Sequence, residues 1–533
     1  MFDNMRSGGV LLCDIRGGGG LSAQAATLIA FVAYLVVVGA VVVWAMLRRT
    51  RDLGDFFLGG RRMNEWVVAL SAVASGRSSW LVVGLSGYAY MFGVAAVWAA
   101  LGYIVVEMFQ FVLLGKRLRR YTHNRNIITV PAFLSERLGD RRKILIWASS
   151  LVITFLFFLY VSAQMVGGGK AVSGAFGVSL TVGVLVTAAI VGVYTVLGGF
   201  VAVSLTDVVQ ACFMIVALVV LPVVAVFKAG GVGALLAKLA SDEHLKLFAQ
   251  YGIKYNPVDV FCFGVVTALG MLGIGLGSPG NPHILVRYMS IRRTAFLRKC
   301  MLVGTIWNVV MAWGAIFAGL AARFFVSPAE ISVDGHLDRE LAFSALARMH
   351  LGPVLLGLVT AAVIAAVMST VDSQLLVISS CITEDIGRRA LGRGGGGRRL
   401  VFVARLVVGI LVVCALLTGL AARGSSVFNF VLVAWSGLGA AFGPIVILAL
   451  YWRRLSWQGA LASIVVGPFV TLFWKGMGWS KSVIYELVPA FGAAFCAALV
   501  VSLLTKPPAD VEKHMQDMLK EKMQRKTEKE ASE

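Results

Sequence analysis

Long apolar runs separated by short polar segments fill the chain between residues 25 and 504. Most runs reach the roughly 20 residues that an α-helix needs to cross the ~30 Å hydrocarbon core of a membrane. Thirteen spans are expected, at 25–47, 64–92, 95–117, 143–169, 176–197, 204–228, 257–279, 299–323, 352–379, 400–422, 427–451, 457–476 and 483–504. The pattern therefore predicts an all-α polytopic membrane protein with about thirteen transmembrane helices, embedded in a lipid bilayer.

Two of the spans are interrupted by small or helix-breaking residues. The second is interrupted at 74–80 (ASGRSSW), and the seventh at 273–282 (GIGLGSPGNP). Backbone groups freed by such a break are tolerated inside a membrane only where they line a cavity or bind something. Paired breaks are typical of secondary transporters built from inverted repeats. We therefore expect one repeat over about 64–228 and a second, of opposite topology, over about 257–451.

The distribution of charge predicts an orientation. The chain is 59% hydrophobic and 14% charged, with a net charge of +21. Its basic residues gather in the segments that follow odd-numbered spans, for example at 48–51 and 116–120. Cytoplasmic loops carry an excess of Lys and Arg. We therefore expect a cell (inner) membrane protein with its N-terminus outside and its C-terminus in the cytoplasm, and no nucleic-acid partner.

The hydrophobic body is expected to be one transporter domain, residues 25–505. Residues 1–24 form a Gly-rich extension that we expect to be disordered, and residues 506–533 form a charged cytoplasmic tail. The seven cysteines are scattered, and the sequence has no His/Cys cluster at metal spacing and no visible nucleophile–base pair. We therefore expect no enzyme activity, no cofactor other than a coupling ion, and no obligate protein partner.

Several segments resemble those of a known family. They are 55–61 (DFFLGGR), 194–200 (YTVLGGF), 204–210 (SLTDVVQ), 282–287 (PHILVR), 365–370 (AAVMST) and 434–444 (AWSGLGAAFGP). On these segments the chain resembles the sodium/solute symporters, most closely the bacterial sodium/proline symporters, over about residues 55–506. The resemblance implies a LeuT-like five-plus-five inverted repeat with flanking helices, and uphill solute import coupled to sodium.

The resemblance also implies a main sodium site between the second and ninth spans. The matching positions are Ala74 and Arg77, which would supply carbonyls, and Ala366, Ser369 and Thr370, which would supply a carbonyl and two hydroxyls. Sodium, a hard cation, prefers such oxygen ligands, and the last three positions share one helix face. Hydroxyls in membrane helices also commonly bond to the preceding turn, which is a purely structural alternative.

Arg77 departs from the family pattern. The sodium/proline symporters carry an aspartate where this chain has Gly76, and an apolar residue where it has Arg77. An arginine at membrane depth stays charged and needs a carboxylate or solvent. Asp207 and Asp372 are the candidate partners. A guanidinium that reaches the ion pocket would take the place of a cation, whereas one that points away would leave the Arg77 carbonyl available to sodium.

Asp207, Asp372 and Ser373 also match a second sodium site that the resemblance attributes to some family members. Two acids there could hold sodium, share a proton or neutralise Arg77. For Asp207 the structural alternative is a helix cap near the cytoplasmic interface.

The solute pocket is expected beside the two breaks. The resemblance places it at Ser78, Ser79, Trp80, Tyr160, Ile274, Ser278 and Pro282. The two aromatic rings suit a small apolar body, and hydroxyls with freed N–H groups suit a carboxylate. The proline transporters carry aromatic residues at the Ile274 and Ser278 positions, so a larger or more polar solute stays open. In the fourth span, Gln164 either faces this pocket or bonds a neighbouring helix, and Lys170 is expected to extend to the outer interface.

These observations favour a sodium-coupled symporter that imports a small organic solute, an amino acid of the proline type, by alternating access. Sodium is then the coupling ion. One alternative is a sodium-independent or proton-coupled carrier in which Arg77 replaces the coupling cation. An alternative of another class is a transporter-like sensor that binds the solute without moving it.

Overall fold

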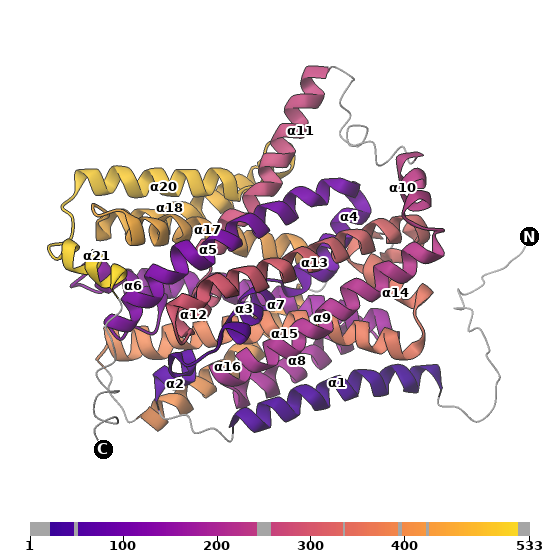
Figure 1. Ribbon diagram of the computed structural model, residues 1–533, viewed down its shortest axis with the longest axis horizontal. Coiled ribbons are helices and arrows are strands. Elements are labelled where there is room, and N and C mark those ends of the chain that lie inside the picture. The colour runs from indigo at the N-terminus through magenta and orange to yellow at the C-terminus, as the bar shows by residue number, and fades with distance from the viewer. Residues whose placement is uncertain are drawn as a thin grey trace, which may run out of the picture.

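A computed structural model of the chain describes residues 22–46, 52–241, 257–333, 336–392, 397–422 and 426–520. These residues are nearly all helical, and their one sheet is the antiparallel hairpin of β1 (Ser332–Val333) and β2 (His336–Leu337). Within the described ranges, eleven helices are long and apolar enough to cross a membrane. They run side by side along the long axis of the molecule (Figure 1). The predicted all-α membrane protein is confirmed.

Long helices make up most of the bundle. They are α1 (Ala23–Met46), α5 (Ala96–Asn124), α7 (Ile144–Phe176), α8 (Leu180–Leu197), α9 (Phe200–Lys228), α13 (Leu297–Phe325), α15 (Pro353–Ser380), α16 (Gly397–Ala421), α17 (Val427–Tyr451), α18 (Trp457–Gly476) and α20 (Leu487–Leu504). Several extend past their predicted ends, as α5 does from 117 to 124, because the apolar pattern marks only the part of a helix that lies in lipid.

Short helices connect the long ones. They are α2 (Leu53–Leu58), η1 (Gly59–Arg61), η3 (Gly93–Ala95), α6 (Val130–Arg137), α10 (Val232–Ser241), η7 (Thr294–Phe296), η8 (Pro328–Ile331), η9 (Arg339–Leu341), α14 (Ala342–His350), η10 (Cys381–Ala390), α19 (Trp479–Ser482) and α21 (Val511–Leu519). Two further hydrophobic segments are each split into pieces.

The first split segment contains α3 (Glu65–Ser75), the π-helical turn η2 (Trp80–Leu85) and α4 (Ser86–Phe92). Asn64 caps α3, since its side chain accepts a hydrogen bond from the Val67 N–H at 2.8 Å. The helix ends at Gly76, and the Arg77 N–H donates to the Ala74 carbonyl at 3.0 Å. The break therefore falls within the predicted interval 74–80.

The second split segment contains α11 (Pro257–Leu272), the 3₁₀ helix η6 (Gly273–Gly280) and α12 (Pro282–Ser290). Asn281 is extended, and Pro282 starts α12, a position where its missing N–H costs nothing. The backbone of η6 packs closely enough that a Cβ on Gly277 would lie 2.0 Å from Nε1 of Trp435. The predicted span 257–279 is too short, because α12 continues the segment past the break to residue 290.

The two split segments meet α15 inside the bundle. α15 packs against α3, α7 and α9, and α12 also contacts it. Its side chains are mostly buried, whereas α16 exposes apolar residues such as Phe402 and Leu406. Each split segment is followed along the chain by four long helices, α5, α7, α8 and α9 in one case and α13, α15, α16 and α17 in the other. This order matches the predicted repeats, and their inverted relationship stays a prediction.

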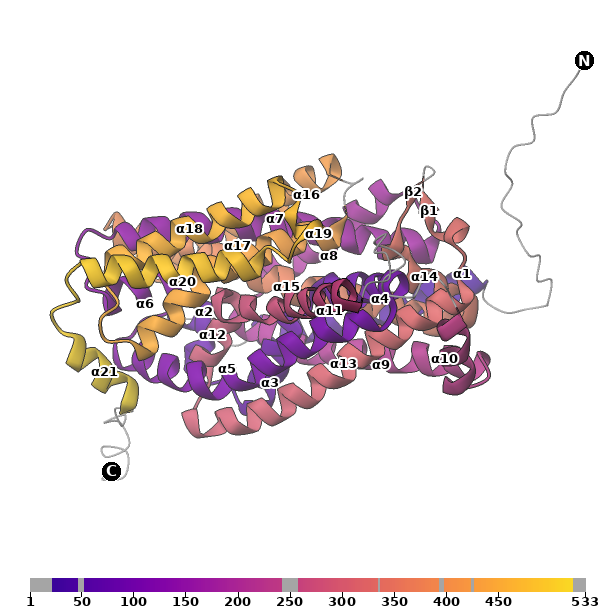
Figure 2. The ribbon, with the colours of Figure 1, turned by 90° about the horizontal axis from the view of Figure 1, so that it is seen from above.

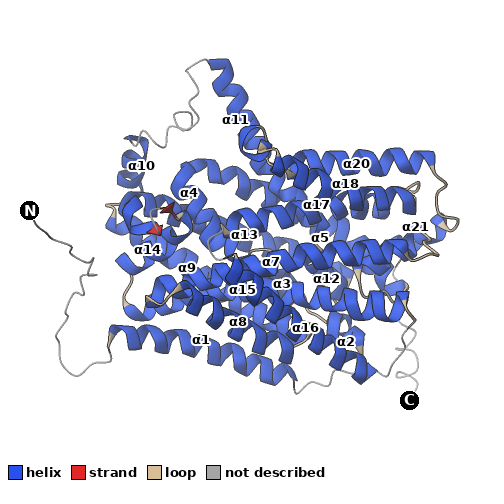
Figure 3. Cartoon of the chain, turned by 180° about the vertical axis from the view of Figure 1, so that it is seen from behind, coloured by secondary structure: helices blue, strands red, loops and turns tan. Residues whose placement is uncertain are grey.

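The two ends of the bundle differ. The N-terminal end of α1 and the β1–β2 hairpin lie at one end, and α21 lies at the other (Figures 1 and 2). α1 and α20 flank the bundle on opposite sides (Figure 3). α21 packs on α5, where Tyr121 Oη and His514 Nδ1 are 2.8 Å apart. Part of the predicted tail is therefore a docked helix. Of the predicted disordered extension, residues 1–21 lie outside the described residues, and Ala23 already belongs to α1.

Candidate functional site

Oxygen atoms from α3 and α15 converge at the first break. The Ser369 hydroxyl lies 3.2 Å from the Ala74 carbonyl, and the Thr370 hydroxyl lies 2.9 Å from the Ser75 carbonyl. The same hydroxyls lie 3.2 and 3.3 Å from the Ala366 carbonyl of their own helix. They thus bond to the preceding turn and also reach across to α3. Four of the five predicted sodium ligands are brought together, with the Ser75 carbonyl as an addition that the sequence did not indicate.

The Arg77 side chain leaves this oxygen cluster and extends toward α5 and α13. Its guanidinium pairs with Glu107, donates from Nε to Oδ1 of Asn308 at 3.1 Å, and donates to the Gly76 carbonyl at 3.1 Å. It also stacks 3.8 Å from the ring centroid of Tyr103. The partner carboxylate is therefore Glu107, and the expectation that Asp207 or Asp372 neutralises Arg77 is wrong.

Glu107 connects the two breaks. Its Oε1 accepts from the Ser278 hydroxyl in η6 at 3.2 Å, and its Oε2 accepts from Asn308 Nδ2 at 2.9 Å. The sequence did carry a signal for it, because Tyr103, Glu107 and Gln110 recur at helical spacing and Glu107 is the one acid between 95 and 117. This polar stripe on α5 faces both breaks.

The second predicted ion cluster forms around a residue that the sequence did not single out. Asp207 Oδ2 lies 2.6 Å from the Ser71 hydroxyl and 3.2 Å from Nη2 of Arg287. Arg287 Nη2 also donates to the Ser373 hydroxyl, which lies 3.2 Å from Asp372 Oδ1. All these side chains are buried. Asp207 lies within α9, which begins at residue 200, so it is not a helix cap. The guanidinium beside the two acids belongs to Arg287, not to Arg77.

The predicted solute residues of the first break, 78–80, contact α5 and α7. The Ser78 hydroxyl and Tyr160 Oη are 3.1 Å apart, and the Ser79 N–H donates to Gln164 Oε1 at 3.0 Å. Gln164 therefore bonds the first break. Trp80 meets Tyr103 edge to face, with ring centroids 5.6 Å apart.

Three further predicted solute residues belong to the second break. The Ile274 carbonyl accepts from Trp435 Nε1 at 2.9 Å. Ser278 is bonded to Glu107, as described above, and its carbonyl accepts from Gln110 Nε2 at 3.3 Å. Pro282 starts α12. Residues of both breaks are therefore buried around the same polar core.

An ion cluster joins α7, η9 and α17 at the end of the bundle that carries β1 and β2. Lys170 Nζ lies 2.7 Å from both Glu340 Oε2 and Asp338 Oδ2. Glu340 Oε1 also accepts from the Phe428 N–H at 2.8 Å, at the start of α17. Burial alone would raise the pKa of Glu340, but Lys170 and these hydrogen bonds hold it below its usual value. Lys170 is only 7% exposed, because these acids cover the end of its side chain, and its extension to the outer interface stays a prediction.

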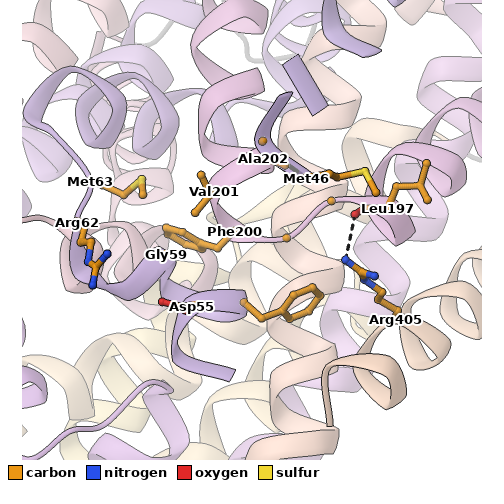
Figure 4. Close-up of a pocket in the computed structure, with 14 residues that line it drawn as sticks. Met46, Asp55, Gly59, Arg62, Met63, Leu197, Phe200, Val201, Ala202 and Arg405 are labelled. Carbon is orange, nitrogen blue, oxygen red and sulfur yellow. Dashed lines mark hydrogen bonds between the residues drawn. The ribbon is translucent and has the colours of Figure 1, made fainter. Parts of the chain in front are cut away.

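A cavity of about 320 Å³ lies at the opposite end, beside the loop between α8 and α9 (Figure 4). Arg405 extends along one side of it and donates to the Leu197 carbonyl at 3.5 Å. Phe200 lines this cavity and also a smaller one, of about 10 Å³, that reaches Arg287 and Ser373. One aromatic ring therefore separates the second ion cluster from the larger cavity.

Broken helices that meet a hydroxyl-bearing helix in the middle of a bundle are the arrangement of a secondary transporter. Solved structures share this fold. The TM-score is 0.76 against a Na⁺-coupled sialic acid symporter in its substrate-bound outward-open state, at 18% identity, with 90% of this chain and 98% of that one covered. It is 0.53 against a nucleobase-cation-symport-1 family transporter in a closed conformation, at 13% identity, with 89% and 100% covered. The expected LeuT-like fold class is confirmed.

Sequence relatives identify the family. The pattern of the Sodium:solute symporter family matches residues 56–467. The osmoregulated proline transporter OpuE of Bacillus subtilis is 35% identical over 487 residues, which cover 91% of this chain and 96% of that one. The sodium/proline symporter of Haemophilus influenzae is 35% identical over 475 residues, which cover 87% and 92%. The chain belongs to the sodium:solute symporter family, and it is a multi-pass membrane transporter that couples solute import to sodium, not an enzyme.

Proposed function

We propose that this chain imports proline, or an amino acid of similar size, together with sodium. The observation that carries the proposal is the gathering of the Ala74 and Ser75 carbonyls with the hydroxyls of Ser369 and Thr370. Relatives named as proline transporters support the choice of solute. The proline transporters that the chain resembles carry aromatic residues at the positions of Ile274 and Ser278. The smaller side chains here would also accept somewhat larger amino acids.

The oxygens of the proposed sodium site come from both halves of the chain, and this suggests how the ion is coupled to transport. Those of residues 74 and 75 belong to the first half of the chain, and the two hydroxyls belong to the second half. An ion bound between them holds α3 against α15 and fixes the shape of the first break. That break also carries the solute residues Ser78 and Trp80, so sodium raises the affinity for solute by ordering them, and solute raises the affinity for sodium equally. The two halves then rock about the loaded site.

Asp207, Asp372 and Ser373 form the proposed second cation site. Two ionised carboxylates beside the one guanidinium of Arg287 would leave one negative charge over in a buried region. A second sodium ion or a proton would balance it, and proton coupling at this cluster is the second candidate mechanism. The alternative in which Arg77 replaces the coupling cation loses support, since its guanidinium is bound to Glu107 on another helix.

Uptake of labelled proline into proteoliposomes tests the proposal. An inward sodium gradient should drive accumulation, and an imposed proton gradient without sodium should not. Uptake that follows the proton gradient alone would establish the proton-coupled mechanism. Binding of proline without uptake would establish the transporter-like solute sensor. We also propose that the end of the bundle with α21 faces the cytoplasm and the end with β1 and β2 faces outside.

A further inference from the structure

Arg77 and Glu107 place two opposite charges at the proposed solute site, where neither ion cluster uses them. The Arg77 side chain is 0% exposed and that of Glu107 is 2% exposed. Arg77 lies in the first break, and Glu107 contacts Ser278 in the second. The ion pair therefore lies between the two breaks, beside Ser78 and Trp80.

Stability does not explain this pair. Removing two charges from water costs several kcal/mol per ion, and well-packed apolar residues in their place are often neutral or stabilising. A buried pair at a ligand site suggests that its charges serve the ligand.

Two polar atoms without partners belong to residues next to the pair. Among the described residues, Tyr103 Oη and Gln110 Oε1 are buried and have no hydrogen-bond partner. Tyr103 carries the ring on which Arg77 stacks, and Gln110 lies one turn from Glu107 on the same face of α5. Buried polar groups are nearly always hydrogen-bonded, so this group of atoms suits a polar ligand.

We propose that Arg77 and Glu107 bind the two charged ends of a zwitterionic amino acid. The guanidinium takes the carboxylate, and the Glu107 carboxylate takes the ammonium group. Asn308 contacts both members of the pair, at 3.1 and 2.9 Å, and keeps them in position while their mutual contact is exchanged for contacts with the ligand. This inference rests on the proposed import of an amino acid and defines how that solute is recognised.

The charge balance of the pocket gives the proposal its selectivity. A zwitterion is neutral overall, so it enters and leaves without changing the total buried charge. An anion that bound Arg77 would leave Glu107 without a counter-charge, and a cation would do the same to Arg77. Because an unpaired buried charge is strongly unfavourable, both kinds of ligand are disfavoured.

Competition against labelled proline in sodium-containing buffer tests the inference. N-Acetylproline lacks the ammonium charge and prolinamide lacks the carboxylate, and each should bind wild-type protein at least tenfold more weakly than proline, roughly 1.4 kcal/mol. The Arg77→Met/Glu107→Gln variant removes both charges and leaves neither unpaired. It should bind proline more weakly and distinguish the three compounds by less than about threefold, or 0.7 kcal/mol. Glu107→Gln alone should lose most of the discrimination against N-acetylproline.

The surface pair of Lys299 and Glu65 provides a matched control. It joins α13 to α3 at 3.0 Å, and its side chains are 47% and 19% exposed. Lys299→Met/Glu65→Gln should keep the wild-type order of affinities. Equal binding of all three compounds to a wild-type protein that still takes up proline with sodium would overturn this inference alone. Wild-type protein that binds none of them would overturn both the inference and the proposed solute. If the double variant does not fold, the wild-type affinities decide.

Discussion

Arg287 on α12 pairs with Asp207 on α9, with Nη2 and Oδ2 3.2 Å apart. The two residues come from opposite halves of the chain, and both are buried. The guanidinium also stacks over the Phe200 ring, 4.5 Å from its centroid. The ion pair therefore joins the second split segment to α9 next to the ring that separates the second ion cluster from the cavity in Figure 4.

Removing Arg287 alone should destabilise the protein more than removing both members of this pair. Arg287→Met leaves two acids without their guanidinium, and breaking a buried pair costs about 3–5 kcal/mol. Arg287→Met/Asp207→Asn removes the unpaired charge on residue 207, so it should recover part of the lost melting temperature in detergent. Thermal unfolding of the two single variants and the double variant measures this. A double variant that melts below both single variants would contradict the coupling.

Loss of either hydroxyl at the first break should weaken sodium binding. Ser369→Ala and Thr370→Ala each remove one oxygen from the main cluster, and we expect the sodium concentration for half-maximal uptake to rise about tenfold, which is roughly 1.4 kcal/mol. Thr360→Ala is the matched control, because the Thr360 hydroxyl bonds only within α15, to the Leu356 carbonyl at 2.8 Å. An unchanged sodium dependence in both site variants would remove these hydroxyls from the ion site.

Glu340→Gln should favour opening of the end that carries β1 and β2. The change removes the charge that holds Lys170 and the start of α17 together. A cysteine at position 78, in a background without the native cysteines, should then react several times faster with an impermeant maleimide added outside. Glu330→Gln is the control, since Glu330 caps an exposed turn of the same connection. Equal rates in both variants would show that Glu340 does not hold this end closed.

The same cluster should weaken in acid. The pKa of Glu340 lies below the usual 4.5 in the folded protein. Its contribution to stability is therefore complete above pH 4.5 and is lost as the pH falls through the lower, folded value. Hydrogen exchange of the residues around 426–428 measures this loss of stability. A rate that is independent of pH, after correction for intrinsic exchange, would contradict the assignment.

Docking of α21 should also depend on pH. Burial, together with the nearby Arg125 and Arg137, lowers the pKa of His514 to about 4. The neutral imidazole is the form that docks, so the docked helix is stable above pH 6.5 and loses stability as the pH falls toward about 4. Hydrogen exchange over 511–519 should accelerate in this interval. His514→Gln, which keeps a polar side chain without a charge, should abolish that dependence.

The sequence predicted the features that depend on local pattern. The break at 74–80 followed from Ser and Gly within an apolar run, and Ser369 and Thr370 could be placed on one face from their spacing alone. The second break followed from Gly and Pro within an apolar run, but the predicted span ends at 279, whereas α12 continues the segment to residue 290.

Partners that come from distant parts of the chain could not be predicted in this way. Arg77 pairs with a residue 30 positions away on another helix, and periodicity on α5 shows only that Glu107 shares a face with Tyr103 and Gln110. Arg287 lies within a segment that the sequence did single out, yet its contact with Asp207 depends on how α12 and α9 each pack on α3. Helix packing, which no local pattern specifies, decides both pairs.

Ser75 belongs to both ion clusters at once. Its carbonyl faces Thr370 at 2.9 Å, while its hydroxyl lies 3.3 Å from Asp207 and 3.1 Å from Ser373. A rotation of Ser75 that changes the distances of its carbonyl to the first ion cluster must also change the distances of its hydroxyl to the second. Occupancy of the two clusters is thus coupled without any relay of intermediate residues, and transport should respond to cation concentration more steeply than a single independent site allows.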